Sequence, residues 1–320
     1  RELSVPLFVL VPLSRALTVD LGTSYARAHV EQTTSGKTET SDIAGLTDTQ
    51  VRATYIIGDD FVVLTGGVNL PTGQSRVTPE QQPAAGLIGS DFLAFPISSM
   101  GAGFGGTGGV AIAHPFGGWN VGGGFSIRRT AQYDPFDTGG GPALHYQPGN
   151  EYRARLGADR TIGSARAMVG FSYSTFGNYD LAGSIYNTGN RYLSQLSFDD
   201  AAGPGRITIA AWDLFRGAGT MLDSIAIGRE NIVNAALSYD VPAGSTLLEP
   251  NIEGRVWSQS QAATSLLATV GVRAQLSVGA LTILPGVGLT TGRVASQDAG
   301  GVSEMASLSG WHATLAVRLR

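Results

Sequence analysis

The sequence contains no cysteine, which excludes structural disulfides, thiolate catalysis and zinc sites built from thiolates. Lys37 is the only lysine among its 21 basic residues, and the net charge is −4. Neither a lysine-rich patch nor an overall positive charge is present to attract nucleic acid, so no nucleic-acid partner is expected. No run of 18 or more apolar residues occurs either, and a transmembrane helix is therefore not predicted.

Glycine is abundant, with 45 of 320 residues, whereas charged residues make up only 14%. Glycine triplets at 122–124 and 139–141 disfavour helices, because a glycine inside a helix costs about 1 kcal/mol relative to alanine. No window of ten or more residues shows the i, i+3, i+4, i+7 spacing of an amphipathic helix. These features predict an all-β chain.

Apolar and polar residues alternate with a period of two from one end of the chain to the other, as half-buried strands require. Clear examples are residues 50–57, 151–158, 166–173, 233–239, 251–256, 266–276 and 311–319. Asp159, Arg160 and Gly163 separate the second example from the third, which predicts a hairpin there.

The alternation predicts a closed antiparallel transmembrane β-barrel of about fourteen strands, within a range of roughly 12 to 16. An even number suits a single-chain barrel of this kind. The predicted strands are 17–31, 48–58, 61–70, 104–114, 119–133, 149–160, 164–177, 190–200, 205–217, 230–241, 247–260, 264–278, 280–292 and 308–320.

Three properties favour a membrane barrel over a soluble sandwich. Most predicted strands reach the roughly 9–11 residues that a tilted strand needs to cross a bilayer. Aromatic residues such as Tyr55, Tyr173, Trp212 and Trp311 lie near segment ends, where an interfacial girdle is expected. Arginine recurs on the polar face, and an open sheet edge in lipid would leave backbone groups without partners. We therefore expect a bacterial outer-membrane location with lipid as a partner.

The first 16 residues are treated as a separate N-terminal segment, and residues 17–320 as the barrel domain. Residues 1–16 have a charged start and an apolar middle, like a signal peptide, but Pro6 and Pro12 interrupt the apolar stretch. A plug, an extra strand and a leftover signal sequence remain open as interpretations of this segment.

The polar face carries the candidate lumen and selectivity residues. Arginines in this position would favour anions through their field, or would brace the lumen by pairing with carboxylates. The predicted set is Arg52, Arg153, Arg155, Arg166, Arg191, Arg206, Arg255, Arg273 and Arg318, with Glu151 and Glu253 as partners.

The segment Pro71–Gly103 is longer than most connections, and such loops are usually functional or disordered. It either folds inward and narrows the pore, with Asp91, Phe92 and Phe95 as a constriction or an apolar binding patch, or forms a solvated loop anchored by an aromatic cluster.

Two stretches resemble known outer-membrane proteins. The strand 311–320 resembles the last strand of such proteins, which normally ends in an aromatic residue, whereas this one ends in Arg320. GVNLPTGQ (67–74), SDFLAFPISS (90–99) and the glycine-rich strands up to Tyr133 resemble the fourteen-stranded transporters of fatty acids and aromatic hydrocarbons. This second resemblance implies uptake of apolar solutes with a plug and a lateral exit.

No catalytic motif is recognised. The histidines His29, His114, His145 and His312 are scattered, and none accompanies a G-x-S-x-G motif. We expect no enzyme activity, no cofactor and no metal. The predicted function is passive passage of small solutes through a polar, arginine-containing lumen. The alternatives are a structural barrel that partners an envelope assembly through loops near 71–103, 134–150 and 293–307, and, less favoured, an outer-membrane hydrolase.

Overall fold

The computed structural model describes residues 1–34, 37–58, 61–93, 95–220, 226–260, 262–297 and 303–319. Strands dominate these residues, which confirms the all-β prediction. A 3₁₀ turn η1 (Pro79–Gln81) and a short helix α1 (Gln82–Ile88) interrupt them. No helix within the described ranges has the length and apolarity needed to cross a bilayer.

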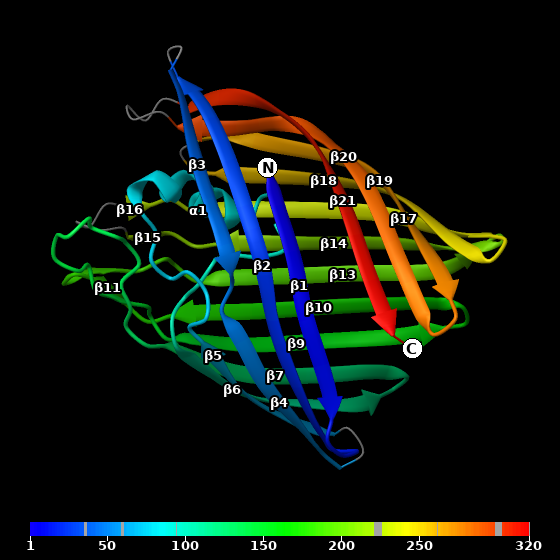
Figure 1. Cartoon of the computed structure of the whole chain (residues 1–320). Helices are drawn as coiled ribbons and strands as arrows, with labels where there is room; N and C mark the ends of the chain where they lie inside the picture. The colour runs from blue at the N-terminus through cyan, green and yellow to red at the C-terminus, as the bar shows by residue number, and fades with distance from the viewer. Residues whose placement is uncertain are drawn as a thin grey trace.

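One antiparallel sheet of sixteen strands forms the body of the molecule (Figure 1). Each strand on the main path pairs with its neighbours in chain order, and β3 pairs beside β4 with the second half of β2. The strands are β1 (Glu2–Pro12), β2 (Leu17–Thr34), β3 (Lys37–Leu46), β4 (Thr49–Ile57), β5 (Val62–Leu70), β6 (Gly105–Phe116), β7 (Trp119–Thr130), β9 (Glu151–Ile162), β10 (Ala165–Phe176), β13 (Arg191–Ala202), β14 (Gly205–Arg216), β17 (Glu230–Ala243), β18 (Thr246–Gln259), β19 (Ala262–Val278), β20 (Leu281–Gln297) and β21 (Ser303–Leu319).

Every predicted strand coincides with a strand of this sheet, but the predicted count of fourteen is not met because β1 and β3 are added to it. Neither addition alternates in the way the prediction required. β3 begins with the polar run Lys37–Thr40, and β1 is apolar on both faces from Leu7 to Val11. Pairing with β2, not local pattern, makes both segments strands.

The two ends of the sheet differ in their connections. One end has tight turns, such as the turn at Gly117 and Gly118, whose positive φ angles of 56° and 80° suit glycine. The other end has the long connections 71–104, 131–150, 177–190 and 217–229. Two of these connections carry a small sheet of β8 (Tyr146–Gln147), β11 (Tyr179–Leu181) and β12 (Ser184–Tyr186), and β15 (Gly219–Thr220) pairs with β16 (Ala226–Ile227).

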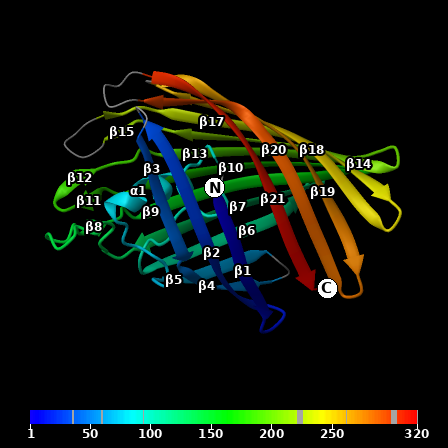
Figure 2. The ribbon, with the colours of Figure 1, turned by 45° about the horizontal axis from the view of Figure 1, so that its top comes forward.

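The sheet curls round on itself, but it is not closed. Figures 1 and 2 both show β1 next to β21, and both strands run in the same direction. Within the described parts of the chain no ladder joins β1 to β21. The closed barrel expected from the alternation is therefore present here as a curled, open sheet.

Candidate functional site

The inner face of the curled sheet is the candidate site. The register of the strands places eight of the nine predicted arginines on this face, namely all of them except Arg318 of β21, which is described below. Arg153, for example, lies between Ser126 of β7 and Ser174 of β10, and Arg155 lies between Gly124 and Ser172. Arg318 shares the face of His312 and Thr314 on β21.

Most of these arginines are neutralised by a nearby carboxylate. The guanidinium of Arg52 lies 2.9 Å from the Asp20 carboxylate, and that of Arg166 lies 3.3 Å from Asp159. The remaining ion pairs are Arg153–Glu151, Arg191–Asp91, Arg206–Asp199, Arg255–Glu253 and Arg273–Glu249. Pairing of this kind fixes the side chains and cancels much of the local field.

Arg155 differs from this pattern, because no carboxylate of the described residues lies within 4.0 Å of its guanidinium. Its cross-strand neighbours, Gly124 and Ser172, are small and uncharged. Arg128 of β7, which is not among the predicted lumen residues, faces Glu151 on the same wall. The wall formed by β7 and β9 therefore carries three inward arginines, Arg128, Arg153 and Arg155. It carries two inward carboxylates, Glu151 and Asp159, and Asp159 pairs with Arg166 of β10.

Residues 71–103, called the inward segment from here on, fold over this inner face, and Asp48 holds both ends of the segment. The Asp48 carboxylate accepts hydrogen bonds from the backbone N–H of Gly73 at 3.0 Å and of Ala102 at 2.7 Å. Asn69 donates to the same carboxylate at 2.7 Å and to the carbonyl oxygen of Gly103 at 2.6 Å. Asp48 is 9% exposed, so these bonds form away from bulk water.

The first half of the inward segment packs on β2 and β3. Helix α1 places Ala84 and Ile88 against Ala26, Ala28 and Ile43, all of which are buried. The Ser41 hydroxyl of β3 donates to the carbonyl oxygen of Glu80 at 2.6 Å and accepts from the Ala84 N–H at 3.2 Å. These contacts fix the helix to the wall.

The second half reaches β17, β18 and β19. Phe92 is 1% exposed and packs against Ile232 and Leu267, with its ring 5.1 Å from that of Trp257. Arg255 donates through Nη1 to the carbonyl oxygen of Phe92 at 2.5 Å. The segment thus folds inward, as one of the two interpretations required, whereas its role as a constriction remains a prediction.

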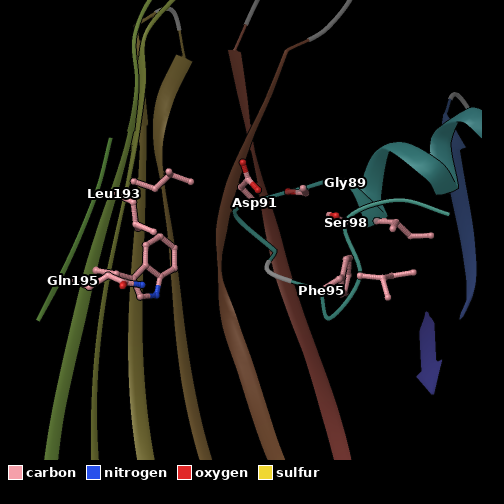
Figure 3. A pocket seen from close by; sticks show the side chains of 11 residues that line it. Gly89, Asp91, Phe95, Ser98, Leu193 and Gln195 are labelled. Carbon is pink, nitrogen blue, oxygen red and sulfur yellow. The ribbon is translucent and has the colours of Figure 1, made fainter. Parts of the chain in front are cut away.

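The other two constriction candidates make contacts different from those of Phe92. The Asp91 carboxylate approaches Arg191 of β13 at 3.9 Å. Phe95 lines a cavity of about 300 Å³ between the inward segment and the wall of β13 and β14 (Figure 3). Trp212 was expected in an interfacial girdle, and this expectation was wrong: Trp212 pairs with Gln195 on the inner face and lines the same cavity. The residues 207–214 are largely apolar on both faces, so their alternation alone could not assign the side.

Tyrosines gather in the long connections. The rings of Tyr146 and Tyr179 stack 6.2 Å apart, and those of Tyr179 and Tyr186 stack 5.2 Å apart. Tyr133 meets Tyr146 edge to face at 5.4 Å. Burial raises the pKa of Tyr133 to about 12 and also raises the pKa values of Tyr146 and Tyr179.

No protein-family model and no curated protein matches the sequence. Solved structures do match it. OmpT of Vibrio cholerae is 9% identical with a TM-score of 0.48, over 99% of this chain and 95% of that one. An anion-selective porin from Comamonas acidovorans is 13% identical with a TM-score of 0.45, over 99% and 88%. A bacterial polysaccharide outer-membrane secretin is 11% identical with a TM-score of 0.49, over 100% and 91%. The chain is similar to these three outer-membrane proteins along almost its whole length, and the outer membrane is the location predicted for it.

Proposed function

We propose that the chain forms a closed barrel in a bacterial outer membrane and lets small solutes pass passively through its polar lumen. The contrast between the two faces of the sheet carries this proposal. Large apolar side chains are exposed on the outer face, with Leu289, Trp311 and Leu315 each about two-thirds to three-quarters exposed. Such a surface suits lipid, whereas the paired charges of the inner face suit water.

Closure through β1 is disfavoured by strand direction. All neighbours on the main path are antiparallel, so the first and last of its fifteen strands run the same way. Leaving out β1 makes β2 and β21 the edges, which are antiparallel to each other. The proposed barrel therefore has fourteen wall strands, β2 and β4 to β21 on the main path, and closes between β2 and β21.

Two prolines on β1 also disfavour closure through this strand. Leu13 N–H donates to the Leu17 carbonyl, and His29 N–H donates to the Arg1 carbonyl, so the odd-numbered residues of β1 bond to β2. The even-numbered Pro6 and Pro12 then lie on the free edge, where each lacks the N–H that a further strand would need. β1 is thus unfit to join β21, and closure between β2 and β21 requires β1 to leave the edge of β2 that it covers in this structure.

The inward segment supports the same closure. It is attached to β2 and β3 through helix α1, and to β17, β18 and β19 through Phe92. Val294 of β20 and Leu308 of β21 also pack against the Phe92 cluster. The segment therefore bridges the opening from the inside and holds the two edges of the sheet near each other.

Solute passage is tested by single-channel conductance of the refolded protein in planar bilayers, with the reversal potential measured under a salt gradient. We expect a steady conductance with a preference for anions, because the wall of β7 and β9 has more arginines than carboxylates. A silent barrel that is folded by circular dichroism would reject the channel and leave the structural barrel with an envelope partner.

The proposal includes the absence of catalysis. Lipase and peptidase assays on the same refolded protein test this part, and turnover above that of a denatured control would contradict it. The conductance measurement is unaffected by either result.

A further inference from the structure

One part of the inner face departs from the small and charged residues around it. Leu193 of β13 pairs with Leu214 of β14, and Gln195 pairs with Trp212, so four large side chains form one patch. We call these four residues the β13–β14 patch. The next inward pairs on either side are Arg191 with Arg216 and Ser197 with Ala210.

The inward segment forms the opposite side of a cavity of about 300 Å³ over this patch. Figure 3 shows Leu193 and Gln195 on one side, across an open space from Gly89, Asp91, Phe95 and Ser98 on the other. Ile88, Phe95 and Ile97 make this second side apolar, and Ser90, Asp91 and Ser98 add polar groups to it. The volume lies at the lower end of the range of about 300–1,000 Å³ for small-molecule sites.

The aromatic wall is fixed before any ligand arrives. Trp212 and Leu214 pack against the buried cluster that contains Phe92. The Arg255 guanidinium carbon lies 5.7 Å from the centroid of the Trp212 ring, in a cation–π arrangement. A side chain held in this way loses little freedom when a ligand binds, which favours binding.

The polar groups restrict the chemistry of the ligand. Asp91 carries the only charge among the described lining residues, and its carboxylate lies 3.9 Å from the Arg191 guanidinium. An anion would face Asp91 and a cation would face Arg191, so neither gains a net partner. The carboxylate of Asp91 and the amide oxygen of Gln195 are hydrogen-bond acceptors, which favour a ligand with an N–H or O–H donor.

We propose that this cavity binds small neutral aromatic solutes that carry one hydrogen-bond donor, with phenol as the simplest member. The ring lies between the β13–β14 patch and Phe95, and the donor is directed to Asp91. This proposal names a class of solute for the proposed channel. It rests on the proposed function in one respect, that the solute reaches the cavity through the lumen.

The test is isothermal titration of the full-length refolded protein in detergent with phenol, benzene, benzoate and benzylammonium. Phenol is expected to bind most tightly of the four. Trp212→Ala and Phe95→Ala are expected to weaken phenol binding at least tenfold, because each removes one side of the cavity. Asp91→Ala is expected to weaken phenol binding several-fold and to leave benzene binding unchanged, since benzene has no donor.

Trp119→Ala and Phe116→Ala are matched controls at the tight-turn end of β6 and β7, and both should bind phenol as the wild type does. Absence of phenol binding overturns the proposal, as does equal binding by Trp212→Ala and Trp119→Ala. If benzene binds as tightly as phenol, the ligand needs no hydrogen-bond donor, which contradicts the role of Asp91. If benzoate or benzylammonium binds more tightly than phenol, the preference for a neutral solute is wrong. Conductance without phenol binding would reject the proposed binding site and support the channel. Phenol binding without conductance would support the binding site and reject the channel.

Discussion

The side chain of Arg255 and the backbone of Phe92 meet on the inner face of the sheet: Arg255 Nη1 donates to the Phe92 carbonyl oxygen at 2.5 Å, although 163 residues separate the two in the chain. The same guanidinium pairs with Glu253 and lies over the ring of Trp212. One inward arginine therefore attaches the inward segment to the wall and also shapes the cavity beside it.

Phe92→Ala is expected to release the second half of the inward segment and to raise the single-channel conductance at least twofold. The substitution removes a ring that is buried to 99%, and losing a buried phenylalanine costs about 3–5 kcal/mol. Phe116→Ala, which truncates a 75% exposed ring at a tight turn, is the matched control and should conduct normally. Unchanged conductance in Phe92→Ala would show that the segment does not narrow the pore.

Asp48→Ala is expected to free both ends of the inward segment. The N–H groups of Gly73 and Ala102 lose their shared acceptor, at about 1–3 kcal/mol for each unsatisfied buried group. Arg76 is the only basic residue in the segment, so cleavage by trypsin after Arg76 reports on the opening. The cleavage rate should rise at least tenfold, because a loss of about 1.4 kcal/mol from the attached state shifts the opening equilibrium tenfold, and the two unsatisfied groups together lose more than that.

Asp48→Asn is the graded comparison, because it keeps one acceptor oxygen and should fall between the wild type and Asp48→Ala. Equal trypsin sensitivity in all three proteins would mean that Asp48 does not hold the segment.

Arg155→Ala should lower the anion preference, and Glu151→Gln should raise it. Arg155 has no carboxylate within 4.0 Å among the described residues, and Glu151 is the carboxylate that pairs with Arg153 on the same wall. The two shifts in reversal potential should have opposite signs and should shrink at about 1 M salt, where the Debye length falls to roughly 3 Å. Shifts of the same sign would contradict the assignment of this wall to the ion path.

Closure between β2 and β21 is expected to allow disulfides between outer-face positions of the two strands. Leu21→Cys is combined in turn with Ala313→Cys, Leu315→Cys or Val317→Cys, and the chain has no cysteine of its own to interfere. At least one pair should crosslink in the refolded protein, detected by gel mobility before and after reduction. The competing pair is Leu21→Cys with Val9→Cys, which are in register in this structure. If only that pair crosslinks efficiently, β1 stays paired with β2 and the proposed closure between β2 and β21 is wrong.

The tyrosine cluster in the long connections should loosen at high pH. Burial raises the pKa of Tyr133 from 10.0 to about 12, so the folded state favours the neutral phenol. The stabilisation is complete below the unfolded pKa of about 10 and is lost as the pH rises through about 12. Titration of tyrosinate absorbance should show a late fraction that decreases in Tyr133→Phe. Simultaneous ionisation of all tyrosines near pH 10 would exclude the buried cluster.

The sequence predicts the position of a site residue where the alternation of its own strand determines that position, and fails where contacts with distant residues determine it. The register places Arg153 and Arg155 on one face of the sheet, as the alternation of residues 151–158 predicted, whereas their role in selecting solutes stays a prediction. Trp212 was assigned to the wrong place because its strand is apolar on both sides, so that only its pairing with Gln195 reveals the face. Asp48 gave no signal in the sequence, since its partners Gly73 and Ala102 are backbone groups of a distant connection.

The local period of two was enough to establish an all-β chain, the position of each wall strand and the side of most arginines, because side-chain direction in a strand follows from position alone. Three-dimensional contacts were needed for the rest. The inward course of residues 71–103 and the cavity beside Trp212 both depend on partners far away in the chain. Such contacts form only where the whole sheet brings their surfaces together, and no local pattern encodes that arrangement.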